Sequence, residues 1–306
     1  MFPQIIQAPT QQPKAENISI RKVDPNKYGD VLGETVGVAI PKDHFIHAIR
    51  LRIVKGTFVG GTSPAWVASA EELLVTNLVL RAEGSKRFKE GKWKEFKALN
   101  IVNLETMTDG SLKLYFTDPK IPDAKPLPAW RFTSLTLELT WAKLTDVTTG
   151  TPTGTVGTKC EITLEESHWD GEQIDNWPCL IEVVRGKTVW GANTGWQNYD
   201  HERVNLVNGF LYHADDNNTD STDIFDTVRV IGRTPAGSFP LYDEVAVVDI
   251  REANKNAFMV AMGTGYWYLD FAGLNTRQFT SLKTQLEIQT AGTNAGIRVM
   301  ERYTLA

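Results

Sequence analysis

Two segments in opposite halves of the chain share the tetrapeptide Phe-Thr-Ser-Leu and the alternating pattern that follows it. Residues 131–141 place leucine or tryptophan at every second position from 135 to 141, with polar residues between them. Residues 278–288 repeat the arrangement, with Leu282, Leu286 and Ile288 on the apolar side. Because successive side chains of a strand point to opposite faces, each segment predicts a strand with one buried face.

The surroundings of the two segments indicate a duplication. The offset of 147 that carries Phe132 onto Phe279 also carries the apolar run 112–116 onto 259–263, so we expect a matching strand at 258–262. A Gly/Thr-rich turn and a last strand follow each copy, at 159–165 and at 297–303. The sequence therefore predicts two similar β domains in tandem.

The chain length agrees with two domains, because 306 residues are twice the usual domain size of roughly 150. Short strands separated by polar loops are typical of a jelly roll. We predict an all-β chain of two tandem eight-stranded jelly-roll β-barrels or sandwiches, a double jelly roll, with short accessory helices. The predicted parts are an extended, Pro-rich N-terminal arm at 1–17, a first jelly roll at 18–167, an interdomain connection at 168–178 and a second jelly roll at 179–306.

Further strands are predicted from alternation or from apolar runs. In the first half they lie at 45–53 and 73–81, and Ser69 with Glu72 is expected to cap a brief helical turn before the second of these. The Thr/Gly-rich piece 146–157 is expected to be a loop within the first domain. In the second half the additional predicted strands lie at 180–184, 204–212, 227–232, 244–250, 257–262 and 266–271.

The most basic segment is 86–97, in which lysine and arginine are interleaved with aromatic residues. Such interleaving suits single-stranded nucleic acid or an anionic membrane surface. Three glutamates dilute the charge, and Gly91 suits a hairpin tip, so the favoured prediction is a solvated hairpin.

Composition excludes several classes of protein. A net charge of −5 lacks the basic excess of a nucleic-acid binder, and 42% hydrophobic content suffices for full cores. No apolar run approaches the roughly 18 to 20 residues of a membrane span, and the first residues do not read as a secretory signal. We therefore expect folding in a cytoplasm, with Cys160 and Cys179 as buried thiols.

The sequence assigns no catalytic residue, no cofactor and no metal ligand. His44 and His47 are three residues apart in a predicted strand, so they face opposite ways and cannot share a metal ion. Glu161 and Glu165 share a strand face, but any alternating surface strand offers such pairs, whereas a glycosidase needs two carboxylates across a cleft.

The acidic loop 215–226 partly matches a calcium-binding loop. From Asp216 it fits the first, third and fifth positions of an EF-hand, but Ser221 stands where the turn glycine belongs and Thr227 where the bidentate glutamate belongs. The favoured interpretation is a solvated loop, with a loose calcium site as the alternative.

Nine tryptophans raise the question of sugar binding, because glycans stack on exposed aromatic rings. Trp141 and Trp267 lie on apolar strand faces and are expected in a core or a subunit contact. Four others cluster in and after the predicted interdomain connection, and either a sugar site or an interdomain or intersubunit seam would explain them. These four are Trp169, Trp177, Trp190 and Trp196.

Tandem eight-stranded β domains with similar closing strands, a Pro-rich N-terminal arm and no catalytic constellation resemble the double jelly-roll major capsid proteins. That family includes the adenovirus hexon lineage and the coat proteins of tailless bacteriophages with an internal membrane. The resemblance covers roughly residues 18–305 and rests on architecture and the internal repeat. It implies a homotrimer whose six jelly rolls make a pseudo-hexagonal tile.

The resemblance also implies partners and a location. Tiles would contact neighbouring capsomers and minor capsid or penton proteins in an icosahedral virion, over an internal lipid membrane, after assembly in the host cytoplasm. No sequence-specific nucleic acid is expected, and the basic segment 86–97 is a hypothetical contact to lipid head groups or a neighbouring tile. The alternative from another class is a carbohydrate-binding tandem jelly roll, either lectin-like or a viral attachment (spike) protein.

Overall fold

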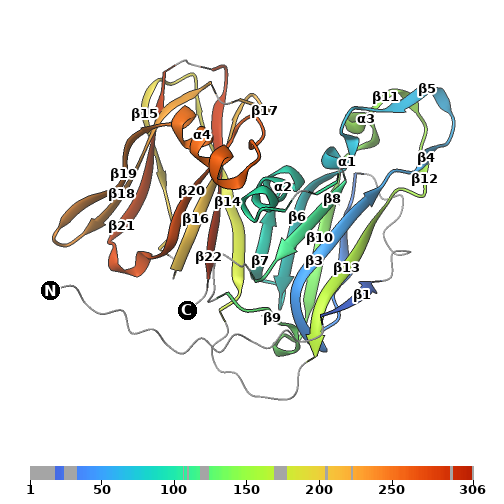
Figure 1. Ribbon diagram of the computed structural model, residues 1–306. Coiled ribbons are helices and arrows are strands. Elements are labelled where there is room, and N and C mark those ends of the chain that lie inside the picture. The colour runs from blue at the N-terminus through green and yellow to red at the C-terminus, as the bar shows by residue number, and fades with distance from the viewer. Residues whose placement is uncertain are drawn as a thin grey trace.

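The computed structural model describes residues 18–23, 33–105, 107–108, 110–117, 124–168, 178–203, 206–221, 223–289 and 292–304. The predicted arm at 1–17 and most of the predicted connection at 168–178 lie outside these residues. Strands dominate each half of the chain, and Figure 1 shows the two halves side by side, with the first half in blue and green and the second in yellow to red. The fold is a double jelly roll, as the sequence predicts.

Two sheets, each with a run of four neighbouring strands, make up the first jelly roll. One sheet has the order β1 (Ser19–Val23), β13 (Lys159–His168), β3 (His44–Val54) and β8 (Ser111–Tyr115), with the short β9 (Leu127–Pro128) beside β3. The other has the order β2 (Thr35–Ala39), β10 (Leu135–Trp141), β6 (Val75–Ala82) and β7 (Lys86–Gly91). All of these pairs are antiparallel.

The second jelly roll repeats both sheets strand for strand. The first has the order β14 (Leu180–Gly191), β22 (Ala295–Thr304), β16 (Leu206–Asp216) and β20 (Tyr266–Asn275), and β17 (Thr219–Asp220) pairs with the end of β16. The second has the order β15 (Gly195–Asp200), β21 (Ser281–Ile288), β18 (Phe225–Thr234) and β19 (Gly237–Ala246). The predicted eight strands per half are therefore present, in matching order.

The duplicated tetrapeptide marks equivalent places in the two halves. It begins directly after a short 3-10 helix in each, η2 (Ala129–Arg131) and η3 (Thr276–Gln278), and leads into β10 and β21. Along both strands, buried positions alternate with partly exposed ones. The apolar face of each strand thus packs into a sandwich core, as the alternation predicts.

The longer helices are equivalent too. Helix α2 (Trp93–Val102) precedes β8, and α4 (Val247–Phe258) precedes β20. Asn100 of α2 binds the backbone N–H and C=O of Lys113 at 3.0 and 2.7 Å, and Asn254 of α4 does the same to Tyr268 at 2.8 and 3.0 Å. Each asparagine side chain thus replaces a missing strand neighbour and fixes its helix on the sheet.

Two predicted strands of the second half were wrong. The strand predicted at 257–262, which includes the repeat match at 258–262, is instead the end of α4 and the loop after it. The strand predicted at 244–250 is the end of β19 followed by the start of α4. The buried residues Val247, Ile250, Asn254 and Phe258 are spaced three or four apart, which is a helical period. The equivalent of β8 is β20, so the offset of 147 does not extend beyond the tetrapeptide region.

The prediction for 86–97 was also wrong. The segment is not a solvated hairpin: residues 86–91 form β7 and 93–102 form α2. Lys89, Trp93 and Phe96 are buried, and so is Gly91, which lies at the strand–helix junction. The brief helical turn predicted after Ser69 does form, as α1 (Ala70–Leu73), but the Ser69 side chain makes no capping hydrogen bond to it.

Residues 146–157 extend from the first jelly roll instead of linking domains. They contain the end of α3 (Leu144–Val147), then β11 (Thr148–Pro152) and β12 (Thr155–Val156). These strands pair with β5 (Gly61–Trp66) and β4 (Thr57–Phe58), which makes the β-structured projection at the upper right of Figure 1. The piece belongs to the first half, as expected, although it has strand structure.

Candidate functional site: the seam between the jelly rolls

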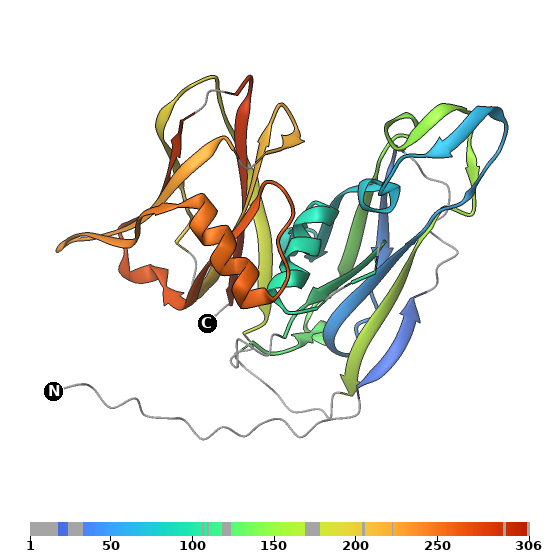
Figure 2. The same ribbon diagram turned by 45° about the horizontal axis from the view of Figure 1, so that its top comes forward.

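The two jelly rolls are joined by main-chain hydrogen bonding. Edge strand β7 of the first pairs in parallel with edge strand β14 of the second, placing Lys89 beside Glu182 and Glu90 beside Val183. One sheet from each half thereby merges into a nine-stranded sheet. Figure 1 and Figure 2 show α2 between the two halves, beside this junction. The pairing covers one edge of each jelly roll and fixes their relative orientation.

A buried ionic cluster lies at the centre of the seam. The Lys89 ammonium is fully buried and donates to Glu182 Oε2 and to the Leu180 carbonyl, both at 2.9 Å. It also lies 4.9 Å from the centre of the Phe116 ring. Arg302 Nε on β22 is 3.1 Å from Glu182 Oε1, so one carboxylate serves two buried cations. Burial lowers the pKa of Lys89, and Glu182 opposes that shift.

A second cluster joins α2 to the second jelly roll. Glu95 accepts the Lys92 backbone N–H at 2.7 Å at the start of the helix, and its Oε1 accepts from Arg298 Nε at 2.5 Å. His213 Nδ1 lies 3.2 Å from the same oxygen. Burial alone would raise the pKa of Glu95, but His213 and Arg298 together lower it to about 2. The carboxylate is therefore ionised and shared across the seam.

Gly91 permits the close approach of the two halves. A Cβ at this position would lie 2.4 Å from Met300 Cε and 2.9 Å from Glu95 Oε2. A larger residue would fit here only if the ends of the Met300 and Glu95 side chains moved away. The glycine that suggested a hairpin tip is thus a contact point between domains.

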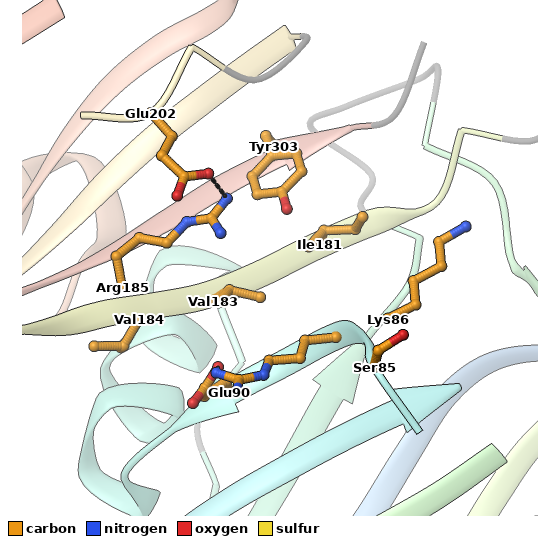
Figure 3. Close-up of a pocket in the computed structure, with 10 residues that line it drawn as sticks. Ser85, Lys86, Glu90, Ile181, Val183, Val184, Arg185, Glu202 and Tyr303 are labelled. Atoms are coloured by element: carbon orange, nitrogen blue, oxygen red, sulfur yellow. Dashed lines mark hydrogen bonds and ion pairs between the residues drawn. The ribbon is translucent and has the colours of Figure 1, made fainter. Parts of the chain in front are cut away.

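An open hollow of about 460 Å³ lies along the seam, and Figure 3 shows its lining. Two ion pairs lie in its lining, Arg87 with Glu90 at 2.6 Å and Arg185 with Glu202 at 2.9 Å. Lys86 lies over the Phe88 and Phe132 rings. Each of the two arginines is therefore compensated by a carboxylate of the same lining, whereas Lys86 is placed over aromatic rings.

No protein-family model and no curated protein matches the sequence. Solved structures do match the fold: the STIV MCP has a TM-score of 0.73 at 14% identity, over 94% of this chain and 96% of that one. The major capsid protein P2 from bacteriophage PM2 has a TM-score of 0.66 at 12% identity, covering 94% and 98%. The PBCV-1 virus capsid has a TM-score of 0.61 at 13% identity, covering 94% of each chain. The chain has the fold of the double jelly-roll major capsid proteins.

Within this double jelly roll, the acidic side chains that suggested chemistry are neutralised locally. Glu161 lies 3.0 Å from Lys159 and 3.7 Å from Arg52, and Glu165 pairs with Arg50 and with Lys113. Both carboxylates are thus paired with cations of the same sheet.

The acidic loop is only partly solvated. Asp215 is buried and binds Lys187 Nζ at 2.5 Å, which corrects the solvated-loop prediction at this residue. Asp216 accepts the backbone N–H groups of Thr293 and Asn294 at 3.2 and 2.8 Å. Asp220, the fifth EF-hand position, is engaged by Lys94 and His213, so these carboxylates do not converge on one point. Among the described residues, no group of three acidic, histidine or cysteine side chains is placed to hold a metal ion.

The histidines and cysteines occupy structural positions. His44 lies 3.1 Å from Asp43, whereas His47 bonds Ser167 at 2.8 Å. Cys160 and Cys179 are buried and free, as expected, and burial raises the pKa of their thiols to about 12 and about 11.

The described tryptophans have different surroundings. Trp141 and Trp267 are core residues, as predicted. Trp190 packs edge-on against Phe225, and Trp196 is 37% exposed with the Arg229 guanidinium 4.7 Å above its ring. Trp169 and Trp177 lie outside the described residues.

Sequence reasoning missed the seam, although two signals point to it. Glu182 is the one charged residue in the apolar run 180–184, and a buried carboxylate requires a buried cation. Lys89 lies between Phe88 and Glu90, in a segment whose glutamates and Gly91 favour the prediction of a solvated hairpin. Pairing between these two positions depends on contacts across the whole chain, which neither segment encodes alone.

Proposed function

We propose that this protein is a structural major capsid protein and not an enzyme. Homotrimers of the chain would form pseudo-hexagonal capsomers of an icosahedral virion. The observation that carries the proposal is the strand-for-strand equivalence of two jelly rolls held side by side by the β7–β14 pairing. Two similar but unequal units per chain let three copies fill six positions around one axis. The likeness to capsid structures supports the same role.

Size-exclusion chromatography with light scattering tests this proposal on the purified chain. We expect a stable species of three times the chain mass of 34.2 kDa, with a six-sided outline by negative-stain electron microscopy. A monomer that stays monomeric at high concentration would contradict the proposal. A monomer retained on immobilised polysaccharide would favour the carbohydrate-binding alternative, which no contact of Trp190 or Trp196 supports.

We propose further that the first jelly roll spans 18–167 and the second 179–306, joined by 168–178. Strand β13 ends at His168 and β14 begins at Leu180, which agrees with this division. A protease site inserted at 172 tests it together with the seam. After cleavage under native conditions, the two fragments should co-elute and separate only in denaturant.

We also propose that the shell encloses a lipid membrane, as the resemblance implies, and that 86–97 is not the lipid contact. Three of its cations, Lys89, Lys94 and Arg87, are paired with Glu182, Asp220 and Glu90. Among the described residues, no helix combines the length and apolar character of a bilayer span. Lipid analysis of purified particles tests for the membrane, and flotation with anionic vesicles tests the protein. Loss of flotation on replacing Lys86 and Arg87 by glutamine would restore 86–97 as a lipid contact.

A further inference from the structure

His213 lies between two carboxylates that come from different jelly rolls. On β16 of the second jelly roll, its Nδ1 is 3.2 Å from Glu95 Oε1, which belongs to α2 of the first. Its Nε2 is 2.9 Å from Asp220 Oδ1 on β17. The side chain is 3% exposed, and its ring stacks on Tyr266 at a centroid distance of 4.3 Å. Water therefore has little access to either nitrogen.

This geometry requires a proton on each ring nitrogen. A neutral imidazole carries one N–H, so its other nitrogen would turn a lone pair toward a carboxylate oxygen. Only the imidazolium donates to both Glu95 and Asp220 at once. Neither carboxylate carries a proton that it could donate to the ring. Burial would raise the pKa of Glu95 and of Asp220, but the surrounding cations lower both values to about 2, so both groups are ionised.

The other charged groups around His213 come from both jelly rolls. Arg298 on β22 is bound to Glu95, and Lys94 on α2 lies 3.1 Å from Asp220 Oδ2 at the outer side of the cluster. Beyond them, Glu72 of α1 is paired with Lys97. Lys92, at the start of α2, faces Arg298 and Glu95.

His201 provides an internal contrast in the same jelly roll. It is also buried, but only one of its nitrogens meets a carboxylate, with Nδ1 at 3.2 Å from Glu301. Its Nε2 lies 2.7 Å from the Thr284 hydroxyl, which can donate to a neutral ring. Burial lowers the pKa of His201, and Glu301 only partly offsets the shift. A neutral imidazole satisfies every contact of this residue.

We propose that protonated His213 is a proton-dependent latch that holds the two jelly rolls together and loosens as pH rises. Burial lowers the pKa of His213, but Asp220 and Glu95 outweigh it and raise the pKa above its usual 6.5. The stabilisation is therefore fully present below about pH 6.5 and is lost as pH increases through the raised value. The inference does not depend on the capsid role.

The test combines histidine-selective ¹⁵N NMR with unfolding of wild-type protein and three variants. At pH 7 both ring nitrogens of His213 should carry protons, whereas His201 should show one; H213Q and H201Q assign the signals. E95Q removes one carboxylate and should shift the His213 titration to lower pH. A singly protonated His213 at pH 7, or a titration unaffected by E95Q, would overturn the latch. Where H213Q folds poorly, sequential assignment of the wild-type spectrum identifies the His213 signals instead.

Urea unfolding between pH 5.5 and 9 gives the second readout. The unfolding constant of H213Q divided by that of the wild type should fall as pH rises from 5.5 to 9. The total fall should be about tenfold for each unit by which folding raises the His213 pKa. The matched control H201Q should not show this fall. A ratio for H213Q that stays constant over the range would contradict the proposal.

Discussion

The sharpest stability prediction concerns the fully buried carboxylate at the centre of the seam. Glu182→Gln keeps the shape of the side chain but removes its charge, so two buried cations, Lys89 at 0% exposed and Arg302 at 2% exposed, lose the Glu182 carboxylate. Breaking a buried ion pair by removing one partner costs roughly 3–5 kcal/mol. We expect the loss to lie at the upper end of that range because two cations are affected.

Lys89→Met should cost less, although it removes the other member of the same pair. Glu182 keeps Arg302 as its counter-charge, and methionine fills much of the lysine volume beside Phe116. The Leu180 carbonyl and Glu182 Oε2 both lose the lysine donor. Each unsatisfied buried acceptor costs about 1–3 kcal/mol. The double variant should cost less than the sum of the two single changes, because it leaves one buried cation instead of two.

Urea unfolding followed by tryptophan fluorescence measures these free energies, since the chain contains nine tryptophans. Lys255→Met and Glu252→Gln on α4 form the matched control, because their ion pair is 55% and 60% exposed. Exposed pairs of this kind contribute only about 0–1 kcal/mol. The reasoning is refuted if Glu182→Gln costs no more than the α4 control, or if Lys89→Met costs more than Glu182→Gln.

Three further predictions follow from other parts of the molecule. Asn254→Ala and Asn100→Ala should each lower the free energy of unfolding in urea by about 1–3 kcal/mol, because each leaves strand backbone groups without their asparagine partner. If neither variant changes the stability, these asparagines do not fix the helices on the sheets. Cys160 and Cys179, with pKa values raised to about 12 and about 11, should react with a thiol reagent at pH 8 only after denaturation, and fast reaction of the native protein would contradict their burial. Because the pKa of Glu95 is lowered from 4.5 to about 2, wild-type stability should fall as pH drops through that interval, and E95Q should show a smaller fall; equal slopes would show that Glu95 does not contribute.

Local pattern was enough to predict the fold class and the duplication. The alternation in 131–141 and 278–288 predicts which face of each strand is buried, and this prediction does not require the partner strands to be known. The same reasoning failed at 86–97 and 244–262. In both places a helix follows a strand within a few residues, and a short apolar run does not by itself distinguish a buried helix from a strand.

The seam was not predictable in the same way, because its residues acquire their roles from the opposite half of the chain. Lys89 and Lys94 have ordinary surface character in sequence, yet one is fully buried against Glu182 and the other is paired with Asp220. The net charge of a short sequence segment does not reveal these ion pairs, since the carboxylate that neutralises each lysine lies far away in the chain.

The sequence by itself determined that the chain makes two all-β sandwiches, because the side-chain period of a strand is a local property that repeats in each half. Only the tertiary structure decided that β7 and β14 join them into one sheet, and that Gly91, Lys89 and His213 belong to the junction. The physical reason is that burial of a charge or close approach at a glycine is a property of two surfaces in contact. Neither surface exists until both halves have folded.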